Sequence, residues 1–404
     1  MNKFALHWQI LIALLLAVLT GIFLPSATKY LNWMGEMFLN ALKMVVIPLI
    51  FSSIVSGVIK MGESKSFGRL GLKTFSYYIL TSVFAILTGL LLVNLIKPGV
   101  GTVVNFPQTD IDLSVEKLSF GQILKGIVPS NIFESMASGN VLPVIFFAML
   151  LGFFISRSSE KSKETLTGFF ESFFEVMMKM TLFIIRFTPL GIFAIVTKAV
   201  AENSDKLSGI AGSLALYMLT VTAALIIHFT ITLPVIARVL GKVNPLQHFK
   251  NMVTPLLTAF STSSSSATLP LTINAVENGS GVSNKISSFT LPLGATVNMD
   301  GTALYECVAA MFIAQIYGVD MSFGMQFLVV AIALLTSIGA AGIPMAGLVM
   351  ISVILSAVNL PLEGVGLILA VDRILDMMRT TVNVWSDSCG AVIIAKSEGE
   401  ELNV

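Results

Sequence analysis

Five strongly polar side chains recur at helical spacing within an apolar stretch near the C-terminus: Asp372, Asp376, Arg379, Asn383 and Asp387. The steps between them are four, three, four and four residues, so they form one narrow stripe on an α-helix. A charge in the middle of a bilayer costs ~2.5 kcal/mol or more. The stripe therefore predicts a binding site that faces a polar cavity, an ion or other charged groups, rather than the solvated face of a surface helix.

The composition indicates that the elements carrying this stripe lie in a membrane. Hydrophobic residues make up 55% of the 404 residues and charged residues only 12%. The net charge of +1 gives no reason to expect a nucleic-acid partner. Cys307 and Cys389 both fall in apolar segments and provide neither a disulfide framework nor a zinc spacing.

Six apolar runs are long enough to cross a bilayer: 7–24, 35–59, 70–96, 141–156, 168–200 and 209–236. We interpret the first as a transmembrane helix rather than a signal peptide, because no small-residue cleavage pattern follows it. Basic residues gather after the second, fourth and sixth runs: Lys60, Lys65, Arg69, Lys73, Arg157, Lys161, Lys163, Arg238, Lys242 and Lys250. This bias predicts that the even-numbered exits are cytoplasmic and, for an even total, that both termini are too.

After Lys250 the regular pattern is interrupted. Residues 251–283 have a serine-rich centre, residues 284–317 are cut at 298–301, and residues 324–358 are cut by the string SIGAAGIP at 337–344. Broken backbone is tolerated at membrane depth only where it lines a cavity or is buried in protein. We therefore predict two helical hairpins with tips near Ser263 and Ser337, related as inverted repeats, with the binding site at their interface. The first enters from the cytoplasm and the second from outside.

Each break offers its own chemistry. Hydroxyls and free backbone N–H groups at a serine-rich tip suit a carboxylate, although a serine run alone is also typical of a linker. Asn298 and Asp300 supply hard oxygen ligands for a small monovalent cation. Asp-Gly also favours a simple turn in a soluble protein, but here the turn would sit inside the membrane.

Four ordered strings carry a resemblance to a known family. They are SSSSATLP at 263–270, FTLPLGATVNMDGTALYE at 289–306, SIGAAGIP at 337–344 and the pattern DxxxDxxRTxxNVxxD at 372–387. The chain resembles the dicarboxylate/amino acid:cation symporters, which include excitatory amino acid transporters and archaeal aspartate transporters. The similarity extends over nearly the whole chain.

The resemblance implies an all-α polytopic membrane protein with eight transmembrane helices and two re-entrant helical hairpins. A static scaffold would comprise 1–67 and 98–207, and an elevator-type transport domain 68–97 and 208–404. It also implies a homotrimer in the lipid bilayer of the cell inner membrane.

The resemblance also assigns roles to individual residues. Arg379 matches the arginine that pairs with the substrate's side-chain carboxylate, and Asp376 the aspartate that binds its α-amino group. The other implied substrate contacts are Ser264, Ser265, Thr302, Ile343, Gly347, Thr380 and Asn383. The resemblance implies three sodium sites. The first comprises Asp387, Asn383, Asn298 and Gly294, and the second Thr296, Met299, Ser337, Ile338 and Ala340. The third comprises Tyr78, Thr81, Ser82, Asn298 and Asp300.

Several positions depart from the family pattern. Archaeal aspartate transporters carry an arginine at the position of Ser263, and animal glutamate carriers carry one at the position of Met377. This chain has neither arginine, but Arg373 lies one turn before Met377. Glu306 matches a glutamate that animal glutamate carriers are thought to protonate, and when deprotonated it could pair with Arg373. Trp385-Ser386 replaces a small pair before the last aspartate.

We therefore expect a secondary active symporter for L-aspartate or L-glutamate, driven by sodium, with protons as a candidate second ion. The alternatives are a C4-dicarboxylate or neutral amino acid symporter of the same family, or an ion channel. An enzyme is disfavoured, because no nucleophile elbow surrounds the serines. The absence of a GxxxxGK loop removes support for ATP as the driver.

Overall fold

The structure is a computed structural model that describes residues 6–62, 68–102, 128–138, 141–202, 207–339 and 346–404. Within these residues it is helical, without strands. The helices of the first half are α1 (Leu6–Phe23), η1 (Pro25–Ala27), α2 (Thr28–Gly62), α3 (Gly68–Ile96), α5 (Ile132–Ala137), α6 (Val141–Ser156), α7 (Glu160–Ile185) and α8 (Thr188–Glu202).

The second half contains shorter and interrupted helices. They are α9 (Leu207–Ile227), η4 (His228–Thr232), α10 (Leu233–Leu240), α11 (Pro245–Thr262), α12 (Ser265–Asn274), η5 (Ala275–Gly279), α13 (Asn284–Val297), α14 (Asp300–Ile316), α15 (Phe323–Gly339), α16 (Ala346–Ala357), η6 (Leu362–Gly364) and α17 (Val365–Ser397).

Helices lie at all six predicted apolar runs, which confirms the helical class. Among the described residues, two helices are long and apolar enough to cross a membrane by themselves, Arg69–Ile96 and Gly209–Leu240. Two bent pairs of helices would raise this number to four if each pair forms one span. One of these pairs is Ile12–Phe23 with Pro25–Phe38, bent by 111° where the chain passes Pro25.

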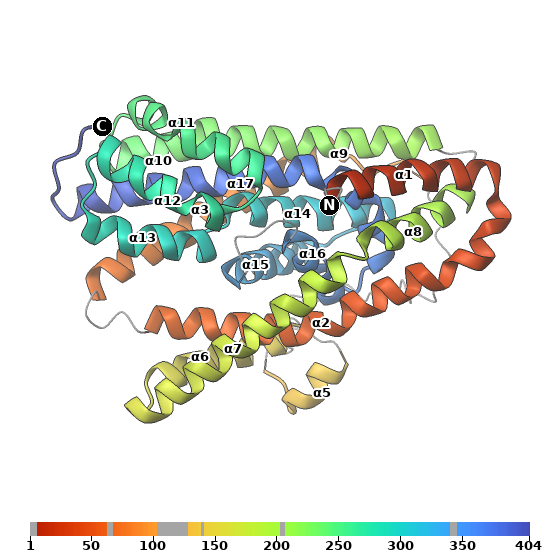
Figure 1. The fold of residues 1–404 in the computed structure, drawn as a ribbon, viewed down its shortest axis with the longest axis horizontal. Helices are drawn as coiled ribbons and strands as arrows, with labels where there is room; N and C mark the ends of the chain where they lie inside the picture. Colours follow the sequence, from red (N-terminus) through yellow and green to blue (C-terminus); the bar gives the residue numbers. More distant parts are fainter. Residues whose placement is uncertain (1–5, 63–67, 103–127, 139–140, 203–206, 340–345) are drawn as a thin grey trace, which may run out of the picture.

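The helices pack in two sets (Figure 1). In one set, α2 packs along α6, α7 and α8, and α1 packs along α8. In the other set, α17 contacts α9, α11, α13 and α14, while α3 packs along α14. The long helix α17 runs through the middle of the second set, so the polar stripe is carried by a helix with neighbours on several sides.

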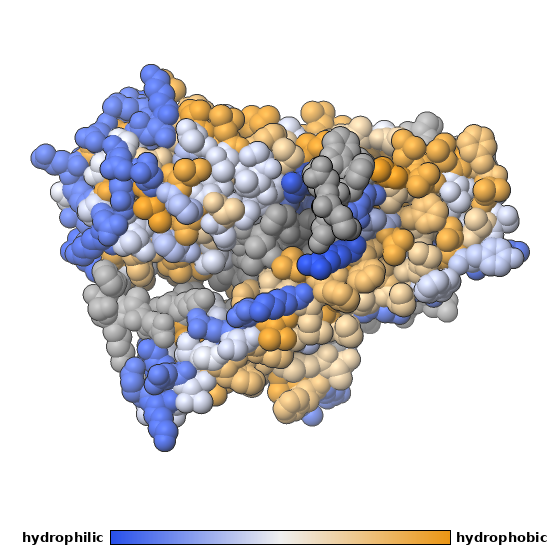
Figure 2. Space-filling view, viewed as in Figure 1, coloured by the Kyte–Doolittle hydropathy of each residue, from blue (hydrophilic) through white to orange (hydrophobic). Residues whose placement is uncertain are grey.

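One end of the molecule gathers hydrophilic side chains, seen as blue on the left of Figure 2. There the Lys73 ammonium at the start of α3 donates to the Ser397 carbonyl at 2.9 Å. The Gln247 amide of α11 donates to the Asn403 carbonyl at 2.6 Å, and Asn403 N–H donates to the Ser280 carbonyl at 3.0 Å. These contacts bring together the start of α3, the start of α11 and the C-terminus, which the basic-residue pattern had predicted to share one side.

The predicted break in the serine run is present. Helix α11 ends at Thr262, and Ser263 adopts a left-handed conformation with φ of 52°. The Ser264 hydroxyl then caps α12 by accepting from the Ala267 N–H at 3.2 Å. Since Asn403 contacts both Gln247 and Ser280, the outer ends of this segment lie close together, and α11 and α12 form a helical hairpin.

A second break separates α13 from α14. Asn298 and Met299 leave helical geometry, with φ and ψ of −98° and 84°, and of −115° and 59°. The Gly301 N–H at the start of α14 donates to the Asn383 side-chain oxygen at 2.8 Å, so α17 satisfies one of the free N–H groups that the break creates. Helices α15 and α16 also pack on each other, but residues 340–345 of their predicted tip lie outside the described residues.

Candidate functional site

The polar stripe of α17 is buried, as predicted. None of its five residues is more than 3% exposed, although two aspartates and an arginine lie within eight residues of one another. Burial of charge at this density is stable only if the groups compensate each other.

Arg379 is the centre of a buried ionic cluster, which we call the Arg379 cluster. Its Nε and Nη2 lie 2.9 and 2.8 Å from Asp376 Oδ1, and its Nη1 donates to Asp372 Oδ1 at 3.3 Å. The Tyr305 hydroxyl of α14 donates to the same Asp372 oxygen at 2.6 Å, and the guanidinium carbon lies 4.3 Å from the centre of the Tyr305 ring. A cation held over an aromatic face gains further stabilisation.

Asp376 and Asp372 are therefore the charged groups that offset the burial of Arg379. The pairing of Arg373 with Glu306 that the sequence suggested is not present in the structure. Arg373 also lies in this region, with its Nη1 3.7 Å from Asp376 Oδ2. It therefore contacts Asp376 and not Glu306, whose Oε2 accepts from Thr336 Oγ1 at 3.0 Å.

Gly347 of α16 lies directly against the guanidinium. A Cβ atom at this position would be 2.5 Å from Arg379 Nη1, closer than real Cβ contacts allow. The second leg of the α15–α16 segment thus approaches Arg379 because residue 347 has no side chain. This places one predicted substrate-contacting position beside the guanidinium.

A second buried cluster surrounds Asp300 at the start of α14, and we call it the Asp300 cluster. Asp300 Oδ1 accepts from Ser82 Oγ at 2.6 Å and from Thr81 Oγ1 at 3.3 Å, both on α3. Asp300 Oδ2 accepts from Ser386 Oγ of α17 at 2.6 Å and lies 3.2 Å from His228 Nε2. Two separate helices, α3 and α17, and the π-helical turn η4 therefore converge on this carboxylate of α14.

Asn298 connects this cluster to Asp387. Its Nδ2 donates to Asp387 Oδ1 at 2.9 Å and to Ser386 Oγ at 3.0 Å, while its Oδ1 lies 3.4 Å from Thr81 Oγ1. Gly294 is also close, because a Cβ atom there would be 2.5 Å from Asp387 Oδ1. The Tyr78 hydroxyl donates to the Thr290 carbonyl at 2.7 Å, on the same side of α13.

The structure thus brings together most residues of two predicted sodium sites. Their donors are carboxylate, amide, hydroxyl and carbonyl oxygens, the ligand type that a hard monovalent cation prefers. In the part of the chain that the structure describes, no group of three His, Cys, Asp or Glu residues is arranged to hold a metal ion. The oxygen donors of these two clusters are of the type that binds a hard cation such as sodium.

The remaining predicted sodium site is not assembled by the described contacts. Thr296 is exposed and donates to the Leu293 carbonyl at 3.0 Å, whereas Ser337 is buried and donates to the Leu334 carbonyl at 2.9 Å. Met299 is buried. The Ile338 side chain and Ala340 lie outside what the structure describes.

The predicted substrate contacts not yet described fall into three groups. Thr302 accepts from the Asn383 amide at 3.1 Å, and Thr380 is buried on α17. Ser264 and Ser265 are buried at the turn of the α11–α12 hairpin, beside Ser263, whose buried hydroxyl has no hydrogen-bond partner among the described residues. Ile343 lies outside the described residues.

Three contacting residues were not among the predicted site residues. Tyr305 supports the Arg379 cluster, whereas His228 and Ser386 both touch Asp300. Ser386 has a usable signal in the sequence, because it is three residues from Asn383 and so shares a helix face with the stripe. His228 lies in none of the four strings that carry the family resemblance, although a lone histidine within a long apolar span indicates a buried partner.

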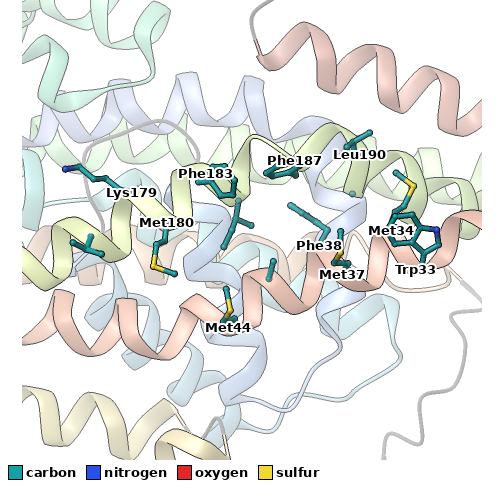
Figure 3. Close-up of a pocket in the computed structure, with 14 residues that line it drawn as sticks. Trp33, Met34, Met37, Phe38, Met44, Lys179, Met180, Phe183, Phe187 and Leu190 are labelled. Atoms are coloured by element: carbon teal, nitrogen blue, oxygen red, sulfur yellow. The ribbon is translucent and has the colours of Figure 1, made fainter.

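A separate apolar groove of about 730 Å³ lies between α2 and the α7–α8 segment (Figure 3). Met37, Phe38, Met180, Phe183 and Phe187 point toward it, and the Lys179 side chain stands at one end. The lining is apolar and none of the residues of the two buried clusters belongs to it. We therefore assign no transported ligand to this groove.

Buried charges at interrupted helices, within an apolar helical bundle, are the features expected of an ion-coupled membrane transporter. Comparison with known proteins agrees: the profile of the sodium:dicarboxylate symporter family matches residues 6–397. The chain belongs to that family, and it is therefore a secondary transporter of the membrane and not an enzyme.

Similar proteins come from bacteria and animals. The chain is 36% identical to the proton/sodium-glutamate symport protein of Geobacillus stearothermophilus, over 99% of this chain and 96% of that protein. It is 35% identical to the proton/glutamate-aspartate symporter of Escherichia coli (strain K12), over 98% and 93%. It is 38% identical to an excitatory amino acid transporter of Caenorhabditis elegans, over 92% and 82%.

Proposed function

We propose that this protein takes up L-glutamate and L-aspartate together with sodium. The observation that carries the proposal is the Arg379 cluster, in which a buried guanidinium lies between two carboxylates on α17. The names of the similar proteins, which refer to glutamate and aspartate, support the same substrate class.

Substrate binding would exchange partners within this cluster. The substrate's α-ammonium group is a cation and would take the place of the guanidinium at Asp376. The guanidinium, freed from Asp376, would then turn to the substrate's side-chain carboxylate, which fits its planar fork through two parallel hydrogen bonds. Each buried charge keeps an opposite partner throughout, so the exchange avoids leaving an uncompensated ion.

Sodium would bind at Asp300 and at Asp387. Both carboxylates are buried and are connected through Asn298 and Ser386, so positive charge at either site lowers the cost of burying negative charge at both. Closure of a hairpin over the substrate would then be favourable only after the ions have entered.

Protons are a candidate second ion, and Glu306 would carry them. Thr336 donates to one oxygen of its fully buried carboxyl, and the other oxygen has no hydrogen-bond partner among the described residues. A buried carboxylate with one oxygen left without a donor is costly, so a proton carried on Glu306 would ease movement of the loaded protein across the membrane.

We also propose the family architecture for this chain: eight spans, two re-entrant hairpins and an elevator-type movement of 68–97 with 208–404 against 1–67 with 98–207. The packing of α17 with α3, α9, α11, α13 and α14 supports a unit of this kind. Cysteine pairs placed across the two sets test the movement. We expect different pairs to cross-link in the presence and in the absence of substrate.

A homotrimer in the cell inner membrane with cytoplasmic termini completes the proposal. Exposed apolar side chains on α2 and α7, such as Met37 and Phe183, support burial of this face against lipid or a neighbouring subunit. Light scattering of the detergent-purified protein should give three times the mass of one chain, and a monomer mass would contradict the trimer. A C-terminal tag should be accessible only from the cytoplasmic side.

The experiment that separates amino acid transport from C4-dicarboxylate transport is competition. Succinate has both carboxylates of aspartate but lacks the ammonium group that Asp376 would bind. We expect unlabelled aspartate to compete with labelled aspartate uptake at far lower concentrations than succinate does. Equal competition by succinate would assign the protein to the dicarboxylate carriers.

A further inference from the structure

Ser386 of α17 joins the two residues at the break between α13 and α14. Its hydroxyl donates to Asp300 Oδ2 at 2.6 Å and accepts from Asn298 Nδ2 at 3.0 Å. The side chain is completely buried, so neither bond competes with bulk water. Ser386 replaces one of the small residues expected before Asp387, and none of the sodium ligands implied by the family resemblance lies at this position.

Ser386 and Ser82 occupy equivalent positions on the Asp300 carboxylate. Ser82 Oγ lies 2.6 Å from Oδ1, and Ser386 Oγ lies 2.6 Å from Oδ2. A hydroxyl group has one proton and two lone pairs. Ser386 uses its proton on Asp300 and one lone pair on Asn298, so one lone pair stays available to a cation beside the carboxylate.

Removal of this hydroxyl would weaken the contacts of both neighbours. Among the described contacts, Asp300 Oδ2 would keep only His228, and Asn298 Nδ2 only Asp387. The position of the Asn298 side-chain oxygen, itself a proposed sodium ligand, would then be fixed less firmly. Ser386 therefore affects the ion site both through its own oxygen and through Asn298.

We propose that Ser386 is a sodium ligand of the Asp300 cluster and sets the sodium affinity of this chain. Its oxygen joins those of Thr81, Ser82, Asn298 and Asp300. The proposal rests on the proposed function in one respect, namely that sodium is the ion bound at Asp300.

The fluorescence of Trp385 can report sodium binding in the test. It has three tryptophans, and Trp385 is adjacent to Ser386. The Trp385 side chain is 1% exposed, its ring centre lies 5.1 Å from that of His248, and its Nε1 donates to the Phe229 carbonyl at 3.1 Å. Replacing Trp8 and Trp33 by phenylalanine leaves Trp385 as the single tryptophan in the full chain.

Sodium is titrated into this purified variant without substrate, with choline holding the ionic strength constant. The sodium midpoint is taken from Trp385 fluorescence and, independently, from the rise in melting temperature that ion binding causes. We expect Ser386→Ala to raise the midpoint by about tenfold or more, the effect of losing a bond to a charged group. Ser386→Cys, which keeps the side-chain volume but offers a soft sulfur, should weaken sodium binding as well.

Two further substitutions are the controls for this result. Ser82→Ala should weaken sodium binding to a similar extent. Ser388→Ala removes another buried hydroxyl of α17, one that donates to the Trp385 carbonyl at 2.8 Å, and it should leave the sodium midpoint unchanged.

The outcomes separate this proposal from the proposed function. If Ser82→Ala weakens sodium binding while Ser386→Ala and Ser386→Cys keep the unsubstituted midpoint, the role of Ser386 is overturned and sodium coupling stands. If the protein with Ser386 intact shows no response to sodium by either measurement, sodium coupling itself is overturned, and the proposal about Ser386 with it.

Discussion

Arg379 and Asp376 form the contact on which substrate choice depends. In the structure they bind each other at 2.8–2.9 Å, so the proposed exchange of partners breaks this contact and gives each group a new opposite charge from the substrate. Replacing either residue removes the shortest ionic contact of the other and leaves it with a longer one, to Asp372 for Arg379 and to Arg373 for Asp376.

Arg379→Ala should abolish uptake of labelled aspartate and glutamate, because no other described cation lies where the substrate's side-chain carboxylate would bind. Arg379→Cys should also lose acidic substrates, and it is the variant in which we look for uptake of neutral amino acids. Arg373→Ala is the matched control, since Arg373 lies 3.7 Å from Asp376 and is partly exposed. Aspartate affinity that is the same in Arg379→Ala and in the unsubstituted protein would contradict the assignment.

Asp376→Asn should weaken aspartate binding by about 10- to 150-fold, which corresponds to the ~1.5–3 kcal/mol of a hydrogen bond to a charged group. Isothermal titration of the purified protein gives the affinity directly. Succinate, which has no ammonium group, should bind the two proteins with nearly equal affinity. A parallel loss of succinate affinity would show that the substitution disrupts Arg379 rather than the amino-group contact.

Glu306→Gln should retain sodium-dependent exchange of labelled substrate while flattening the pH dependence of net uptake. The reason is that glutamine fills the same buried position beside Thr336 but carries no titratable proton. Uptake and exchange are measured in proteoliposomes over a series of pH values. If the pH profile of net uptake stays as it was, Glu306 is a structural carboxyl and sodium is the only ion that the proposal retains.

At the scale of elements, the site depends on close approach of α14 to α17. A Cβ atom on Gly301 would lie 2.5 Å from the Arg379 carbonyl oxygen, and this backbone atom cannot move out of the way cheaply. The same approach brings the Gly301 N–H within 2.8 Å of Asn383. A glycine here is therefore needed for packing.

Gly301→Ala should destabilise the protein by about 1–3 kcal/mol, the usual cost of overpacking, even though alanine favours a helix. Gly212→Ala is the matched control, because Gly212 lies in α9 with no heavy atom within 4 Å of the added Cβ. We expect a lower melting temperature for Gly301→Ala and an equal or higher one for Gly212→Ala. If both melt at the unsubstituted temperature, the close packing of α14 on α17 is not essential.

The sequence predicted these elements better than their contacts. Helical spacing was enough to place five polar groups on one face of α17, and the runs of serine and of Asn-Met-Asp-Gly marked the breaks at 263 and at 298–299. Which partners the stripe would choose could not be predicted, because Arg379 has Asp372 and Asp376 within reach on its own helix and Tyr305 on another. The contact of His228 with Asp300 depends on the π-helical turn η4, which no residue pattern predicted.

At the scale of the whole molecule, substrate and sodium should bind cooperatively. The proposed sodium sites at Asp300 and Asp387 are connected by hydrogen bonds through Asn298 and Ser386, and Asn383 links α17 to the start of α14. Sodium should therefore tighten aspartate binding, and aspartate should tighten sodium binding by the same factor, as linkage requires. Titrating each ligand at several fixed concentrations of the other measures both factors, and aspartate binding that does not change when sodium is replaced by choline would contradict sodium coupling.

Uptake into proteoliposomes tests the central claim most directly. Purified protein is reconstituted, and labelled glutamate is supplied with an inward gradient of sodium or of choline. We predict accumulation above the external concentration with sodium, none with choline, and none for Arg379→Ala under either condition. Equal accumulation in sodium and choline, or passive equilibration with no accumulation in sodium, would contradict a sodium-driven symporter of acidic amino acids.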